Sequence, residues 1–223
     1  MRRPDTLRPF AANPHAHGAT DRVEATVRAL DLMLFGWIGA GLHPMPWLLS
    51  PAIAIAQQGA WLSVLILAWA AWRHPAERVY LMGTLAACGV TAMLVHALAA
   101  AIDLPRPFML GLSPAYIPHG ARGSFPSAHA AVMSTVAAIL RMCPVLRHVG
   151  MAAAAAAALT GWARIYVGVH FPLDMVGGVV LALAVAGLFQ VARQVLRQWS
   201  AAPAPLEMRA DADSIDPLTR RLP

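Results

Sequence analysis

Residues 79–101, VYLMGTLAACGVTAMLVHALAAA, form an apolar run that contains no Asp, Glu, Lys or Arg. A helix needs about 20 mostly apolar residues to cross the hydrocarbon core of a bilayer. Four other stretches of the chain have a similar character: 49–72, 127–140, 145–166 and 173–196. The stretch 127–140 is short, and Phe125 and Met142 extend it. The pattern predicts an all-α integral membrane helical bundle.

The first apolar run, 30–42, differs from the others. It is short, contains Asp31, and is followed by Pro44 and Pro46, which end a helix. This run either crosses the membrane with help from Trp47 or lies partly in the interface. Counting it, we expect about six transmembrane helices.

The composition supports a membrane protein. Hydrophobic residues make up 58% of the 223 residues and charged residues 13%, whereas soluble domains carry about a quarter charged residues. All 17 basic residues are Arg, and they lie singly between the apolar runs. Nucleic-acid binding requires a gathered basic face, so we expect none. The two cysteines form no CxxC motif and give no zinc or redox signal.

The two ends of the chain are polar. Residues 1–28 lack an early apolar stretch and are not a cleavable signal peptide. We therefore expect a polar cytoplasmic N-terminal tail over 1–28, a membrane-embedded domain over 29–199, and a disordered cytoplasmic C-terminal tail over 200–223.

The arginines predict the orientation of the helices. If the N-terminus is cytoplasmic and all six segments cross, the cytoplasmic ends hold Arg73, Arg78, Arg141, Arg147, Arg193 and Arg197. The opposite face holds only Arg106, Arg122 and Arg164. This asymmetry follows the positive-inside rule. It places the long connection 102–125 outside the cytoplasm.

Three short motifs bring ionisable residues to that non-cytoplasmic face. They are PRPF at 105–108, FPSAHA at 125–130 and ARIYVGVHFPLD at 163–174. Ionisable groups at membrane depth are costly and usually functional. Because three separate segments contribute them, this face is the candidate active site.

The first two motifs suit an anion. Arg106 lies between two prolines that restrict its backbone, and its planar guanidinium fits phosphate oxygens. Ser127 precedes an apolar helix as a candidate N-cap, and a helix N-terminus favours anions. His129, in the first turn, can reach a leaving oxygen. The alternatives are an interfacial arginine that snorkels to the headgroups and a simple helix cap.

The third motif suits nucleophilic chemistry. His170 and Asp174 have the i, i+4 spacing that brings a carboxylate to one imidazole nitrogen. The other nitrogen is then a nucleophile or a base. A break at Gly168 lets Arg164 face the same pocket; the alternative is a structural pair with an interfacial arginine. Donors dominate the combined set, which indicates a phosphate anion rather than a divalent metal.

At these residues the chain resembles the type 2 phosphatidic-acid phosphatase superfamily, over roughly residues 79–196. The family signatures are Lys-x6-Arg-Pro, Pro-Ser-x-His and Ser-Arg-x5-His-x3-Asp. The matching positions are Arg106 and Pro107, then Pro126, Ser127 and His129, then Arg164, His170 and Asp174. Two positions depart: Ala99 stands where the family has Lys, and Ala163 where it has Ser. Arg122 and His119 are the candidates to replace the missing charge.

The resemblance implies a role for each residue. His170 attacks phosphorus, Asp174 orients it, and His129 protonates the leaving oxygen and then activates water. Other residues hold the phosphoryl oxygens: Arg106, Ser127 and Arg164. No metal or cofactor is implied.

The loop 106–129 is similar to the bacterial undecaprenyl-diphosphate phosphatase branch. This implies a multi-pass inner-membrane enzyme with both termini cytoplasmic and its active site at the periplasmic face. Phosphatidic acid, phosphatidylglycerol phosphate and lipid A stay open as substrates, as does phosphoryl transfer to another lipid.

Two other classes are weighed against the enzyme. A catalytically inactive protein that binds lipid phosphate would explain Ala99, but binding alone does not need His170 paired with Asp174. A channel or transporter would show repeats and polar groups at the midplane, which this sequence lacks. The oligomeric state is left open.

Overall fold

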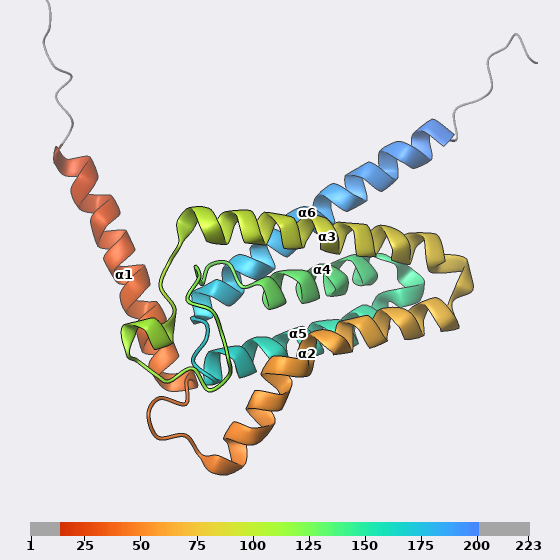
Figure 1. The fold of residues 1–223 in the computed structure, drawn as a ribbon. Coiled ribbons are helices and arrows are strands. Elements are labelled where there is room, and N and C mark those ends of the chain that lie inside the picture. Colours follow the sequence, from red (N-terminus) through yellow and green to blue (C-terminus); the bar gives the residue numbers. More distant parts are fainter. Residues whose placement is uncertain (1–13, 201–223) are drawn as a thin grey trace, which may run out of the picture.

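The computed structural model describes residues 14–200, and their side chains from residue 21 on. The regular secondary structure of this part of the chain is all helical, with no strand (Figure 1). The α-helices are α1 (Pro14–Ile38), α2 (Pro46–Arg73), α3 (Arg78–Ile102), α4 (Ala128–Met142), α5 (Arg147–Tyr166) and α6 (Pro172–Ser200). Three short 3₁₀ helices join them: η1 (Pro75–Glu77), η2 (Pro107–Leu110) and η3 (Pro144–Leu146).

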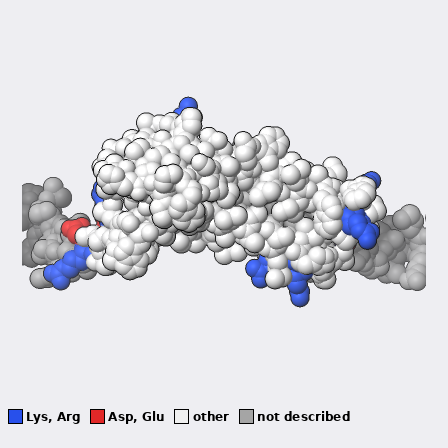
Figure 2. All heavy atoms as spheres, turned by 90° about the horizontal axis from the view of Figure 1, so that it is seen from below, with Lys and Arg blue, Asp and Glu red and all other residues white. Residues whose placement is uncertain are grey.

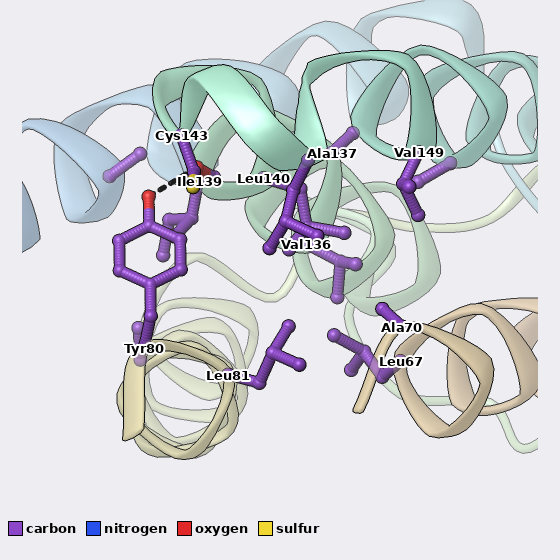
Figure 3. Close-up of a cluster of buried hydrophobic side chains, with 14 of the residues drawn as sticks. Leu67, Ala70, Tyr80, Leu81, Val136, Ala137, Ile139, Leu140, Cys143 and Val149 are labelled. Atoms are coloured by element: carbon purple, nitrogen blue, oxygen red, sulfur yellow. Dashed lines mark hydrogen bonds between the residues drawn. The ribbon is translucent and has the colours of Figure 1, made fainter. Parts of the chain in front are cut away.

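The short helix α4 forms the centre of the bundle. It packs mainly against α5, α6 and α3, and α2 covers α5. The core between these helices includes Val136, Ile139 and Leu140 of α4 (Figure 3). The Tyr80 hydroxyl of α3 donates to the Ile139 carbonyl at 2.6 Å. Small residues along α4 and α5 allow helices to approach closely, as is usual inside membranes.

Two helices extend beyond the bundle. In Figure 1, α1 and the C-terminal part of α6 project away from it on opposite sides. The helix α1 begins at Pro14 and so crosses the expected boundary at residue 28. Residues 21–28 include Ala, Glu and Arg, which favour helix. The other parts of the predicted tails, 1–13 and 201–223, lie outside the described residues.

The surface of the helices is that of a membrane protein. Within residues 14–200, three helical stretches are long and apolar enough to cross a bilayer: Pro46–Arg73, Pro75–Leu110 and Pro172–Ser200. Large apolar side chains such as Trp61, Met82 and Leu188 are exposed on them. Most of the face in Figure 2 carries no charged side chain, and charges lie at its margins. The predicted count of six crossings and their orientation stay predictions.

One end of the bundle holds all three motifs. There α3 and α5 end while α4 and α6 begin, and the connection 103–127 folds over them (Figure 1). At the other end, the short connections through η1 and η3 leave little chain outside the helices. The topology therefore gathers the candidate residues at one end.

Candidate active site

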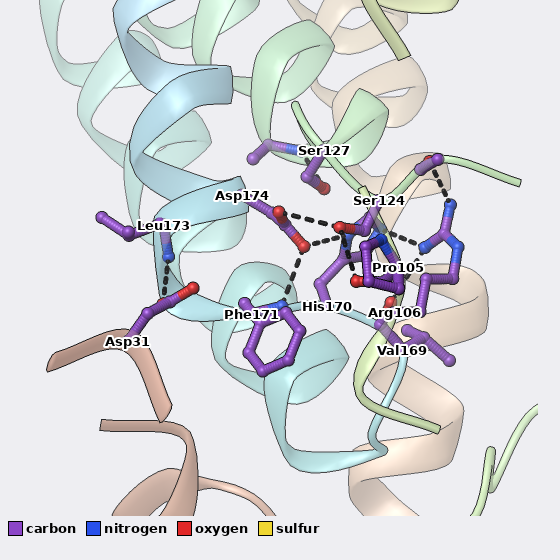
Figure 4. A network of polar contacts seen from close by, with 12 residues as sticks. Asp31, Pro105, Arg106, Ser124, Ser127, Val169, His170, Phe171, Leu173 and Asp174 are labelled. Carbon is purple, nitrogen blue, oxygen red and sulfur yellow. Dashed lines mark hydrogen bonds and ion pairs between the residues drawn. The ribbon is translucent and has the colours of Figure 1, made fainter. Parts of the chain in front are cut away.

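His170 and Asp174 form a buried pair at the start of α6. His170 lies in the connection between α5 and α6, and its Nδ1 is 3.0 Å from Oδ2 of Asp174. The same Oδ2 accepts from the Phe171 backbone N–H at 2.8 Å, and Oδ1 accepts from the Ser124 hydroxyl at 3.1 Å (Figure 4). The two side chains lie together, as the i, i+4 spacing predicts.

Arg106 joins this pair to the loop above it. Its Nη1 lies 3.2 Å from Nε2 of His170 and donates to the Val169 carbonyl at 2.8 Å. Its Nε donates to the Arg122 carbonyl at 2.9 Å, and its Nη2 donates to the Gly123 carbonyl at 3.1 Å. A guanidinium has only donors, so Nε2 of His170 is the acceptor. The neutral imidazole therefore carries its proton on Nδ1.

The starts of α4 and α6 are in close contact beneath the pair. The Ser127 backbone N–H donates to the Asp174 carbonyl at 3.0 Å. A Cβ placed on Gly178 of α6 would lie 2.9 Å from both the Ala130 Cβ and the Ser127 carbonyl oxygen. Only glycine allows α6 to approach α4 this closely. The second and third motifs are held together by this packing.

Ser127 lies differently from the other predicted phosphate ligands. Its hydroxyl accepts from the Ala130 N–H at 3.5 Å, which makes it the N-cap of α4. The side chain is fully buried, and it is not part of the cavity wall. The predicted cap is thus present, while the hydroxyl faces its own helix.

A cavity of about 950 Å³ opens beside the pair. Six of the predicted residues line it: Arg106, His119, Arg122, His129, Arg164 and His170. His96, Ala99 and Asp103 form its wall on the α3 side. Asp174 lies behind His170 and does not reach the cavity. The nucleophile candidate, the acid candidate and three arginines thus share one space.

Arg164 is a largely buried residue of the cavity wall. Its side chain is only 3% exposed, and Nη1 donates to the Ala56 carbonyl at 3.0 Å. Its Nε finds no hydrogen-bond partner among the described residues. A buried donor without a partner is unfavourable, so this guanidinium is held with incomplete hydrogen bonding in the wall of the cavity.

The histidines of the two loops are held neutral. Burial lowers the pKa of His170 well below its usual range, and nearby Arg164 and Arg106 act in the same direction. Burial, with Arg106 and Arg164, lowers the pKa of His119 to about 4. The ring of His119 lies 5.9 Å from that of His170. The neutral imidazole of His170 therefore shares the cavity with Arg106, Arg122 and Arg164.

Sequence reasoning missed two residues that touch the pair or its helix. The Ser124 hydroxyl donates to Asp174. The only sequence signal for this contact is that Ser124 directly precedes the motif at 125–130. Asp31 of α1 accepts from the Leu173 N–H at 2.9 Å. An acidic residue inside an apolar run was the available signal for Asp31. From the sequence alone, Asp31 is only a reason to question whether the run 30–42 crosses the membrane.

The site can hold an anion and supply one nucleophilic nitrogen. In residues 14–200, no three His, Cys, Asp or Glu side chains gather so that they could hold a metal ion. The positive groups are guanidinium donors from Arg106, Arg122 and Arg164. Such donors in a water-poor cavity stabilise phosphoryl oxygens.

Comparison with known proteins places this site in a family. The "Putative undecaprenyl-diphosphatase YbjG" of Escherichia coli (strain K12) is 31% identical over 156 residues, which are 69% of this chain and 78% of the relative. The undecaprenyl-diphosphatase BcrC of Bacillus subtilis (strain 168) is 34% identical over 104 residues, 45% of this chain and 52% of the relative.

Two crystal structures resemble the fold. LpxE of Aquifex aeolicus matches with a TM-score of 0.60 and 27% identity, covering 72% of this chain and 94% of that one. A transmembrane PAP2 type phosphatidylglycerolphosphate phosphatase from Bacillus subtilis matches with a TM-score of 0.57 and 26% identity, covering 76% and 87%. The PAP2 superfamily model matches residues 79–197, which include all three motifs, and the chain therefore belongs to the PAP2 superfamily.

Proposed function

We propose that this protein is a metal-independent phosphatase of a lipid diphosphate, most specifically undecaprenyl diphosphate, and that it acts through a phosphohistidine. Membership of a family of membrane lipid phosphatases supports the general reaction. The observation that supports the mechanism is the series of contacts from Arg106 to His170 to Asp174. In it Nε2 of His170 carries no proton, and His170 lines the cavity together with the arginines.

The proposed reaction has two steps. Nε2 of His170 attacks the terminal phosphorus, an N–P bond forms, and the P–O bond to the lipid phosphate breaks. His129, which is protonated when the anionic diphosphate binds beside it, gives this proton to the leaving oxygen and becomes neutral. His129 then takes a proton from water, whose oxygen attacks phosphorus and breaks the N–P bond, releasing inorganic phosphate. Asp174 supports the positive charge that develops on the imidazole.

The roles of the arginines follow from their contacts. The guanidinium of Arg164 binds a phosphoryl oxygen, since Arg164 lines the cavity and does not use all of its donors in the described residues. Arg106 releases Nε2 of His170 when a phosphoryl oxygen competes for its Nη1 hydrogen. Arg122 and His119 line the same cavity. In the proposed complex they contact the terminal phosphate of the diphosphate. Donors fixed before the reaction stabilise its charge without reorganisation.

Two arguments support the substrate and the membrane side. The relatives named as undecaprenyl-diphosphatases favour undecaprenyl diphosphate over phosphatidic acid, phosphatidylglycerol phosphate or lipid A. The arginines at the far end of the bundle, such as Arg73 and Arg147, favour a cytoplasmic position for that end. The active site would then face the periplasm of the inner membrane.

The test is phosphate release by purified protein in detergent with EDTA, from undecaprenyl diphosphate and phosphatidic acid in parallel. We expect release that persists in EDTA, is faster with undecaprenyl diphosphate, and disappears in His170→Ala. Folded protein that binds both lipids and releases phosphate from neither would instead support a binding protein. Equal activity of His170→Ala and the unchanged protein would exclude the phosphohistidine.

A further inference from the structure

The first turn of α6, which carries Asp174, is capped by a different helix. Phe171 precedes this turn and has no side-chain acceptor, so it cannot satisfy the free N–H groups of the helix start. Pro172 has no N–H. The N–H of Leu173 is accepted by Oδ1 of Asp31, from α1, at 2.9 Å (Figure 4). A carboxylate is favoured here by the helix dipole as well.

The same part of the chain also binds the end of α5. The Ala40 N–H, two residues after α1, donates to the carbonyl of Tyr166 at 2.9 Å. Tyr166 is the last residue of α5 and Leu173 lies in the first turn of α6. The segment 31–40 therefore holds both flanks of the short connection in which His170 lies.

An aromatic contact adds to these two hydrogen bonds. We call the contacts of Asp31, Phe35 and Ala40 with the ends of α5 and α6 the brace. The rings of Phe35 and Phe171 meet edge to face with centroids 5.3 Å apart. Both side chains are buried, and they cluster with Ile165 of α5 and Met175 of α6. Phe171 follows His170 directly, and its N–H is bonded to Asp174. A shift of Phe171 would move both members of the pair.

The contact is local, because most of the described side chains of α1 are exposed. Val23, Leu30 and Trp37 are 62%, 47% and 76% exposed, whereas Phe35 is 4% exposed. The brace also lies outside residues 79–197, which match the family model. The cluster of buried residues around α4 is built from α2 to α6 and contains no residue of α1.

We propose that Asp31 and Phe35 are positioning residues for the phosphatase reaction, which fix the His170–Asp174 pair from outside the family domain. The proposal rests on the proposed function, in which Nε2 of His170 attacks phosphorus. Misplacing a reacting group by about 1 Å costs up to about 100-fold in rate. The phosphate-binding donors of Arg106 and Arg164 are not touched by α1, so ground-state binding should be preserved.

The test compares Asp31→Ala, Asp31→Asn and Phe35→Leu with Glu24→Ala, which changes an exposed carboxylate on the same helix. In Asp31→Ala we expect kcat to fall about 10-fold, with KM within about twofold. The asparagine oxygen can still accept from Leu173, so Asp31→Asn should recover most of kcat. Phe35→Leu should lower kcat by a smaller factor, and Glu24→Ala should match the unchanged protein.

Single-turnover measurement of the phosphorylated enzyme tests the positioning role separately from the proposed phosphatase function. Slower phosphoenzyme formation in folded Asp31→Ala supports positioning. An unchanged kcat in Asp31→Ala, or no recovery in Asp31→Asn, overturns the brace. Full activity in His170→Ala would overturn the proposed function instead. If Asp31→Ala folds poorly, an unchanged kcat per folded molecule in Phe35→Leu overturns the brace.

Discussion

Nη1 of Arg106 lies 3.2 Å from Nε2 of His170, the nitrogen opposite the one that bonds Asp174. A permanent donor thus points at the lone pair that the proposed reaction uses. This contact selects the tautomer with Nδ1 protonated. It also keeps a proton from settling on Nε2, because a second positive charge beside the guanidinium is unfavourable. The substrate must then draw the Arg106 hydrogen toward itself.

Arg106→Lys should lower kcat/KM by about 100-fold or more, since one ammonium cannot replace a planar fork that reaches several fixed acceptors. In the native site the guanidinium spans the carbonyls of Arg122, Gly123 and Val169. Phosphate release in detergent measures the effect. Arg73→Lys, at the other end of the bundle, is the matched control. Near-native activity in Arg106→Lys would mean that charge alone is needed.

Asp174→Asn should lower kcat by about 1000-fold or more, by analogy with the aspartate of catalytic triads. The amide would keep an oxygen for Phe171 or Ser124 but would offer N–H to Nδ1 of His170. The proton would then be displaced to Nε2, where Arg106 already donates. Rapid quench of the phosphoenzyme measures its formation.

Ser124→Ala is the graded comparison for this change. It removes one hydrogen bond from Oδ1 of Asp174 and leaves the bond to His170 in place. We expect a loss of about 10-fold, the scale of one hydrogen bond to a charged group. A loss as large as that of Asp174→Asn would show that orientation of the carboxylate, rather than the imidazole tautomer, limits the reaction.

The free energy of unfolding should decrease at acid pH, because the pKa values of His119 and His170 are lowered in the folded protein. The pKa of His119 is about 4 in the folded chain and 6.5 in the unfolded chain. Between these values the unfolded chain binds more protons, so the free energy of unfolding decreases as pH falls from about 6.5 toward about 4. Above about 6.5 both states are neutral and this histidine has no effect.

Thermal unfolding in detergent at about pH 7.5 and about pH 4.5 measures this dependence. His119→Asn should reduce the loss of Tm in acid but not abolish it, because the pKa of His170 is lowered as well. His148→Asn, far from the cavity, should leave the dependence unchanged. An identical acid loss in His119→Asn and the unchanged protein would contradict the assignment.

The parts of the site that could be predicted from sequence are those set by local geometry. The pairing of His170 with Asp174 follows from one helical turn, and the N-cap at Ser127 follows from one residue type before an apolar run. Five apolar runs predict the bounds of α2 to α6 to within a few residues, since burial in lipid requires continuous apolar stretches, whereas the run 30–42 falls in α1, which begins at Pro14.

The remaining contacts depend on how distant segments pack. Arg106 bonds carbonyls of Gly123 and Val169, and any residue supplies a carbonyl, so no side-chain pattern marks them. Asp31 bonds Leu173 across 142 positions of sequence. The Ser127 hydroxyl caps its own helix, as its place before an apolar run predicts, and its contact with phosphate stays a prediction.

The position where the family carries lysine tests the role of Arg122 directly. Ala99 and Arg122 line the same cavity from α3 and from the loop above it. If Arg122 replaces the missing positive charge, Arg122→Ala should lower kcat/KM by about 10-fold, the scale of one charge-assisted hydrogen bond. The backbone carbonyl that accepts from Arg106 is retained in this variant.

Ala99→Lys should then restore most of the activity of Arg122→Ala. The ammonium of the new lysine would enter the shared cavity and supply the positive charge that Arg122→Ala removes. In the unchanged protein the same lysine should add little, so the two effects should be non-additive in a double-mutant cycle. Phosphate release from undecaprenyl diphosphate gives all four rates, and Ala99→Met controls for side-chain volume. Equal gains from lysine with and without Arg122 would show that the two positions act on different parts of the substrate. Recovery with methionine would show that filling the cavity, not the charge, is what matters.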